Sequence, residues 1–166
     1  MKCALPLTMV GCVLLAGCHK SDPVWDIPCD ERPAREVLIG TGESEFIPLG
    51  KDKLQIQYGS QGGQHIWMSL RLRGFGPEIT AQFGFFDTEN PALVYSGPNT
   101  DADELQYNDT LDVSETLGMF AVLNDWDEAT QMPMPSPSGH DVILWADVTD
   151  QCTTEAVHAD APASVE

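Results

Sequence analysis

Carboxylates gather in two short segments in the second half of the chain. Asp101 and Asp103 lie in one segment, and Asp125 and Asp127 lie in the other. Calcium takes about six to eight oxygen ligands, which carboxylates in loops at one end of a β-sandwich can supply. The EF-hand pattern is missing, however, and aspartates are frequent in this chain. The four residues therefore predict either a calcium-stabilised accessory domain or a solvated acidic surface, and we favour the surface.

Two thioethers and an imidazole lie close together at Met132, Met134 and His140. These are soft ligands that suit copper. No second Met/His cluster accompanies them in the sequence, so we favour a proline-stiffened loop between two strands over a copper-binding protein.

A tryptophan and two arginines alternate with apolar residues in the segment 65–73. In a strand, one face carries His65, Trp67, Arg71 and Arg73, and the opposite face carries Ile66, Met68 and Leu70. Trp and Arg often anchor binding surfaces, so the first face predicts a site for a protein or glycan partner. Two alternatives stay open: the arginines pair with acidic residues across strands while Trp67 packs over them, or the sheet is covered on both sides.

Catalytic patterns are weak in this chain. The motifs G-x-S-x-G and H-E-x-x-H are missing from the sequence. His140 and Asp141 are adjacent, but neighbouring residues of a strand point to opposite faces and make a poor dyad. We therefore expect a non-enzymatic protein, with a hydrolase as a remote alternative.

Apolar and polar residues alternate with a period of two over much of the chain after residue 35. The clearest segments are 54–58, 66–73, 79–85 and 142–148. Such alternation is typical of half-buried strands in antiparallel sheets. Shorter candidates lie at 37–39, 46–49, 93–95, 117–123 and 154–158, with turns rich in Gly, Pro and Asn between the strands.

This spacing predicts an all-β fold, a two-sheet immunoglobulin-like antiparallel sandwich of about seven to nine strands. We expect the sandwich to span residues 36–158. The Cys…Trp…Cys hallmark of true immunoglobulin domains is missing, so the expectation concerns architecture only. The polar, Pro-rich residues 18–35 predict a tether, and residues 159–166 predict a flexible tail.

Charge is distributed very unevenly along the chain. The 166 residues include 26 Asp or Glu and 8 Lys or Arg, giving a formal net charge of -18. Residues 1–73 hold 8 acidic and 8 basic residues, whereas residues 74–166 hold 18 acidic and no basic ones. This excess argues against nucleic acid as a partner, since phosphate binding requires Lys and Arg. It also disfavours contact of the second half with anionic lipid.

The N-terminus combines Lys2 with an uncharged apolar run and ends in Leu15-Ala16-Gly17-Cys18. This sequence resembles the lipobox of bacterial lipoproteins. The resemblance implies a signal peptide over residues 1–17, cleavage before Cys18, and acylation of Cys18 as a membrane anchor. His19 stands where Asp commonly signals retention in the inner membrane of Gram-negative cells, which favours the outer membrane. An ordinary secretory signal with a chance cysteine is the alternative.

Cleavage leaves three cysteines in the mature chain, Cys18, Cys29 and Cys152. With Cys18 acylated in an oxidising compartment, Cys29 and Cys152 become the expected disulfide. Two free thiols or a cysteine metal site are the alternatives, although neither cysteine has a C-x-x-C companion.

A second resemblance covers roughly half of the expected domain. Its residues are Gly40-Thr41-Gly42-Glu43, Phe46-Ile47-Pro48-Leu49, Gln61-Gly62-Gly63-Gln64-His65-Ile66-Trp67 and Val148-Thr149-Asp150. Together they resemble a pattern in uncharacterised bacterial lipoproteins and secreted proteins. The resemblance implies a coherent domain and carries no activity with it. From all these features we expect a lipid-anchored envelope domain that acts as a binding or structural module.

Overall fold

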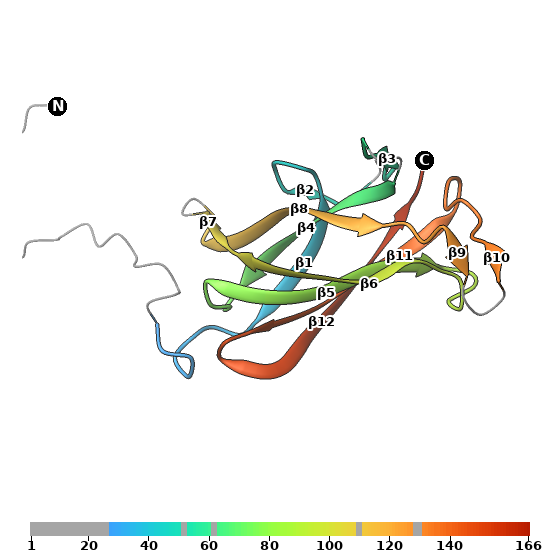
Figure 1. Ribbon diagram of the computed structural model, residues 1–166. Helices are drawn as coiled ribbons and strands as arrows, with labels where there is room; N and C mark the ends of the chain where they lie inside the picture. The colour runs from blue at the N-terminus through green and yellow to red at the C-terminus, as the bar shows by residue number, and fades with distance from the viewer. Residues whose placement is uncertain (1–26, 51–52, 61–62, 109–110, 128–130) are drawn as a thin grey trace, which may run out of the picture.

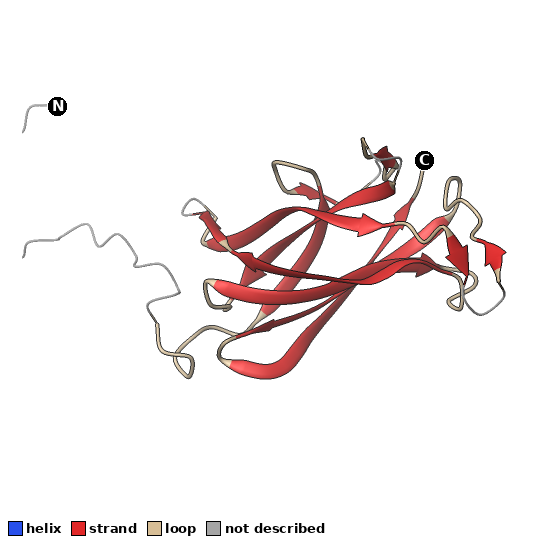
Figure 2. Cartoon of the chain, in the orientation of Figure 1, coloured by secondary structure: helices blue, strands red, loops and turns tan. Residues whose placement is uncertain are grey.

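The computed structural model describes residues 27–50, 53–60, 63–108, 111–127 and 131–166, and these residues form an all-β domain (Figure 1). Strands and loops make up the described chain, as Figure 2 shows. None of the described segments is a helix long and apolar enough to cross a membrane. The signal peptide and lipobox expected at residues 1–18 lie outside the described residues.

The first sheet is built on three long antiparallel strands, in the order β1-β4-β8. They are β1 (Glu36–Thr41), β4 (Gln64–Arg73) and β8 (Val113–Val122). Three short strands extend it: β2 (Ile47–Pro48) pairs with β1, β3 (Gln57–Tyr58) with β4, and β7 (Gln106–Asn108) with β8.

The second sheet has four antiparallel strands, in the order β12-β11-β5-β6. They are β5 (Glu78–Asp87), β6 (Val94–Glu104), β11 (Asp141–Asp150) and β12 (Thr153–Ser164). A separate small hairpin, β9 (Trp126–Asp127) with β10 (Met132–Pro133), lies at one end of the molecule (Figure 1).

The order of the strands matches that of an immunoglobulin-like sandwich. The strands β1, β4 and β8 correspond to A, B and E, and β6, β5, β11 and β12 correspond to C′, C, F and G. The predicted fold class is therefore confirmed. Seven of the strands given above have six or more residues, at the lower end of the predicted range, and the others have two or three.

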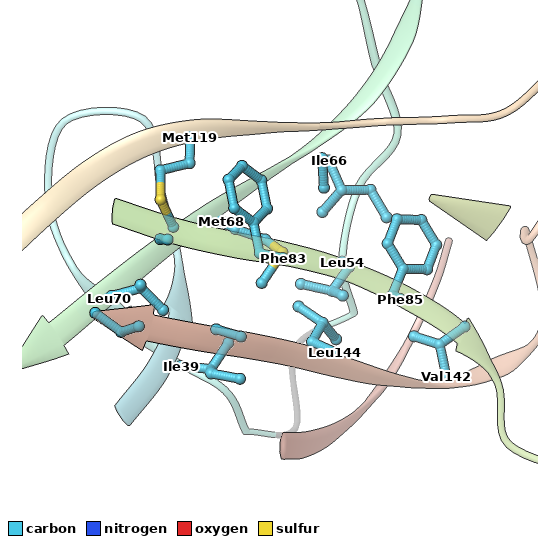
Figure 3. Packing of buried hydrophobic residues seen from close by; sticks show 14 of the residues in the cluster. Ile39, Leu54, Ile66, Met68, Leu70, Phe83, Phe85, Met119, Val142 and Leu144 are labelled. Atoms are coloured by element: carbon cyan, nitrogen blue, oxygen red, sulfur yellow. The ribbon is translucent and has the colours of Figure 1, made fainter. Parts of the chain in front are cut away.

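The core fills the space between the two sheets. Alternate residues of β4, β5, β8 and β11 point inward from both sides, as Figure 3 shows. Ile66, Met68 and Leu70 of β4 meet Phe83, Phe85 and Leu144 of the opposite sheet, all almost fully buried. Period-two alternation thus puts one face of each strand in the core, as expected.

The predicted flexible tail at residues 159–166 is wrong. These residues continue β12, which pairs with β11 in register up to Ser164 opposite Asp141. Val165 is fully buried and bridges to Leu54. The inward positions of β12 are mostly alanines, whose small side chains give a weak alternation signal, and Pro162 is tolerated because β12 is an edge strand.

Two predicted strands differ from the structure in extent. Of the segment 54–58, only β3 and an isolated bridge at Leu54 are formed. Conversely, β6 extends from Val94 to Glu104 and includes Asp101 and Asp103, which we expected in a loop. Acidic residues are poor strand formers, but β6 is an edge strand, where charged side chains discourage pairing with another chain.

The expected disulfide is present between Cys29 and Cys152, with the Cα atoms 5.6 Å apart. It joins the segment before β1 to the turn between β11 and β12. The described part of the predicted tether is therefore fastened to the sandwich, and the domain begins before residue 36.

A buried carboxylate lies beside this disulfide. The Asp150 side chain is 0% exposed and accepts hydrogen bonds from Arg32 Nη1 at 3.3 Å and Arg35 Nη2 at 3.1 Å. The backbone N–H groups of Gly76 and Cys152 donate to the same carboxylate, at 2.8 and 3.1 Å. We call these five residues the Asp150 clasp. The clasp connects the start of the domain with the β4–β5 and β11–β12 turns.

Candidate functional site

The predicted binding residues lie on β4, whose alternate residues face away from the core. Trp67 and Arg71 are half-buried, Arg73 is exposed, and Ile66, Met68 and Leu70 are buried on the other face. The prediction that these polar and aromatic residues share the outer face of β4 is in line with this burial pattern. His65 departs from it, because it is only 8% exposed.

The burial of His65 arises from an aromatic cluster formed by His65, Trp67 and Phe120. The ring centroids are 4.8 Å apart for His65 and Trp67, 4.8 Å for His65 and Phe120, and 4.4 Å for Trp67 and Phe120. Trp67 and Phe120 are direct cross-strand partners of β4 and β8, an arrangement that stabilises the sheet. Phe120 is 52% exposed, so the cluster presents an aromatic ring to solvent.

A β-bulge sets the position of Phe120. The pairing of β4 with β8 shifts between Met68 and Leu70, opposite the segment that contains Gly118. Gly118 has a φ of 70°, and a Cβ there would lie 2.6 Å from the carbonyl oxygen of Glu43. Glycine is therefore required at this position. The extra residue turns Met119 inward and Phe120 outward, beside Trp67.

One of the two arginines, Arg71, pairs with an acidic residue across strands, as the first alternative interpretation expected. Arg71 forms an ion pair with Glu115 on β8, with Nη2 and Oε1 2.7 Å apart, and its guanidinium lies 4.2 Å from the centroid of the Phe46 ring. Arg73 lies opposite Glu36 at the end of β4. Arg71 is thus part of the sheet's own cross-strand packing, and the aromatic cluster lies on the same outer face, near the start of β4 and the end of β8.

A hollow of about 380 Å³ lies beside the aromatic cluster. Its lining includes Ser60, Gln64, His65, Phe120 and Val122. The Nε2 atom of His65 is buried and has no hydrogen-bond partner among the described residues. An unsatisfied buried nitrogen costs free energy, so it marks this position as one that requires an explanation.

Asp101 and Asp125, two of the four aspartates predicted to bind calcium, lie far apart in the structure. Asn124, next to Asp125, bonds to Tyr95 and Val94 at the start of β6. Asp101 lies seven residues further along the same strand, which corresponds to roughly 20 Å. Over the described side chains, which exclude those of Asp103 and Asp127, no group of three or more His, Cys, Asp or Glu residues could hold a metal ion.

The expected copper ligands also point to different places. Met134 packs against the hydrophobic core, whereas Met132 is exposed on β10. His140 Nδ1 donates to Asp87 Oδ2 at 2.9 Å. His140 therefore pairs with Asp87 and not with the adjacent Asp141, which accepts a hydrogen bond from Ser164.

Asp87, Tyr95 and His140 form a polar cluster at the end of β5. The Tyr95 hydroxyl donates to Asp87 at 3.0 Å, and the backbone N–H groups of Glu89 and Asn90 donate to the same carboxylate. The backbone hydrogen bond from Asn90 lowers the pKa of Asp87, with smaller contributions from Tyr95, His140 and Glu89, against the effect of burial. All these bonds order the turn between β5 and β6, which gives Asp87 a structural role.

A hollow of about 540 Å³ lies near the Asp150 clasp. Its lining includes Glu78, Thr80, Thr149 and Asp150. The carboxylate of Asp150 is already held by two arginines, and Thr80 and Thr149 are paired strand residues. The hollow therefore lacks a convergent set of reactive groups.

Several of these residues were missed in the sequence for a common reason. Phe120 depends on a bulge, Asp150 pairs with arginines far away in the chain, and Asp87 pairs with the distant His140. The local signals were the aromatic residue at position 120 in an expected strand and the turn directly after Asp87, whose N–H groups bond to its carboxylate. No family model, curated protein or solved structure matches this chain, so the geometry alone supports the functional argument.

The pKa of Tyr95 supplies a test of the polar cluster. Burial raises this pKa from the ordinary value of 10.0 to about 12, and the hydrogen bond to Asp87 and its negative charge act in the same direction. Because the folded pKa is raised, the stabilisation is fully present below pH 10 and is lost as the pH rises towards 12.

We expect the wild-type chain to be more stable than Tyr95→Phe by a constant amount from neutral pH up to pH 10, and the difference to shrink as the pH rises from 10 towards 12. Urea unfolding of both chains at a series of pH values measures this difference. A difference that stays constant across the whole series would contradict the assignment.

Proposed function

We propose that this chain is a lipid-anchored domain of the bacterial cell envelope, of a non-enzymatic type, that binds a partner protein or glycan through the outer face of its first sheet. The observation that carries the proposal is the aromatic cluster of His65, Trp67 and Phe120, with half of Phe120 exposed. Exposed aromatic residues at the centre of a surface are typical anchors of binding.

The surroundings of the cluster support a binding surface. Val122 lies opposite His65, two residues from Phe120 on the same face of β8, and it is about half exposed. Adjacent exposed apolar side chains of this kind are uncommon on a monomer unless they serve an interaction. The ion pair of Arg71 with Glu115 borders this surface with charge, as the polar rim of an interface does.

The anchor rests on the lipobox resemblance and on chain length. Eight residues, 19–26, separate Cys18 from the described domain. Even a fully extended segment of this length spans at most about 28 Å. An acylated Cys18 would therefore hold the sandwich close to the membrane surface, which suits a partner that is itself part of the envelope.

The anchor predicts the mass of the mature N-terminus. We expect the protein purified from the membrane fraction to begin at a Cys18 that carries acyl chains, because the lipobox directs cleavage before this residue. Mass spectrometry of the N-terminal peptide tests this, with Cys18→Ser as the control that should accumulate unprocessed. An unmodified N-terminus at another residue would contradict the anchor.

The binding face predicts the effect of Phe120→Ser. We expect this change to weaken partner binding at least tenfold, since buried aromatic anchors commonly contribute more than about 1.4 kcal/mol. Crosslinking of the anchored protein in intact cells, followed by quantitative mass spectrometry, identifies and measures the partner. Leu111→Ser is the matched control, because Leu111 is similarly exposed but lies in the turn before β8. Equal recovery of every crosslinked species by both variants would contradict the assignment.

A further inference from the structure

The outer face of the second sheet carries a second aromatic residue in a hollow of its own. Phe86, Trp145, Asp147, His158 and Asp160 line this hollow, whose volume is about 340 Å³. Trp145 lies directly opposite Asp160 on β12, and Asp147 lies directly opposite His158. The neighbouring residues Leu144, Ala146 and Val148 are buried, so Trp145 and Asp147 share the face turned away from the core.

The glycines beneath Trp145 allow its ring to lie close to the sheet. Trp145 is paired with Gly84 on β5. A Cβ at Gly97 on β6 would lie 3.4 Å from Trp145 Cζ2, and one at Gly84 would collide with the backbone of Ser96. The indole thus covers a part of the sheet that has no side chains, and it forms a flat wall of the hollow.

The charges around the ring are negative and lack a strong counterion. His158 Nδ1 donates to Asp147 Oδ1 at 2.8 Å. Asp160 is more remote, with its Oδ2 4.0 Å from His158 Nε2, and its side chain is 68% exposed. Because Arg73 is the last Lys or Arg of the chain, the four strands of the second sheet contain neither residue.

We propose that this hollow binds a cationic side chain, arginine above all, of a basic segment in a partner protein. The guanidinium group would lie against the indole of Trp145 and pair with the carboxylates of Asp160 and Asp147. Arg stacks on aromatic faces and pairs with carboxylates in a planar geometry. One guanidinium group can therefore contact the indole and the carboxylates at the same time.

Charge complementarity selects this occupant. An anionic ligand would meet a sheet without a single Lys or Arg, in a chain with a net charge of -18. A basic segment supplies the charge that the sheet lacks, and the field of the whole protein draws it in. The site is on the opposite side of the sandwich from the aromatic cluster of His65, Trp67 and Phe120, so it does not depend on the function proposed for that cluster.

The test uses the mature, full-length chain in a neutral maltoside detergent and a fluorescent peptide of alternating Gly and Arg. A peptide with citrulline in place of Arg has nearly the same shape without the charge. We expect the Arg peptide to bind, as measured by fluorescence anisotropy, and the citrulline peptide not to bind. Trp145→Leu should weaken binding about two- to fivefold, the range for a cation–π contact at an exposed site.

Matched variants separate the site from general attraction to an acidic protein. Asp160→Asn and Glu155→Gln each remove one exposed negative charge from β12, and only the first change should weaken binding by more than about twofold. Trp145→Phe keeps an aromatic face and should retain binding, which guards against a folding defect in Trp145→Leu. Trp67→Ala, on the other sheet, should bind as the wild type does. Equal weakening by Asp160→Asn and Glu155→Gln, with none by Trp145→Leu, would overturn the proposal.

Discussion

The buried carboxylate of Asp150 joins three segments that are distant in the sequence. Two arginines from the start of the domain and two backbone N–H groups from turns donate to it, and the Cys29–Cys152 disulfide lies beside it. Removing a carboxylate from water is costly, and only a complete set of donors offsets that cost. The clasp therefore forms only when the segment that carries Arg32 and Arg35 lies against the sandwich. It fastens the start of the described chain to one end of the sandwich.

The outer faces of the two sheets differ in their chemical character. The first sheet contains Arg71 and Arg73 and shows an aromatic, partly apolar outer surface. The second sheet is made entirely of chain that follows Arg73, so it carries acidic residues and no Lys or Arg. The charge asymmetry of the sequence thus becomes an asymmetry between faces. A single domain can in this way offer two different surfaces, one suited to apolar contacts and one to a basic partner.

The sequence predicted what depends on local alternation, and it failed where long-range pairing decides. The strands β4, β5 and β11 have large inward residues that alternation reveals, whereas most of β12 buries alanines, which give no such signal. Trp67 was correctly placed on the outer face, but its partner Phe120 was missed because the bulge at Gly118 changes which residues face out. The disulfide followed from counting cysteines. Asp101 and Asp103 were expected in a loop but lie on β6, because an edge strand tolerates acidic residues that alternation alone does not assign to a strand.

The stability of Asp150→Asn tests the clasp most directly. Asparagine keeps the shape of the side chain but removes the negative charge with which Arg32 and Arg35 pair. Urea unfolding of the disulfide-bonded chain should show a loss of about 3–5 kcal/mol in unfolding free energy. The exposed Asp125→Asn is the control and should change it by less than about 0.5 kcal/mol. Equal effects of the two substitutions would contradict the account, because the carboxylate of Asp150 would then not hold the three segments together.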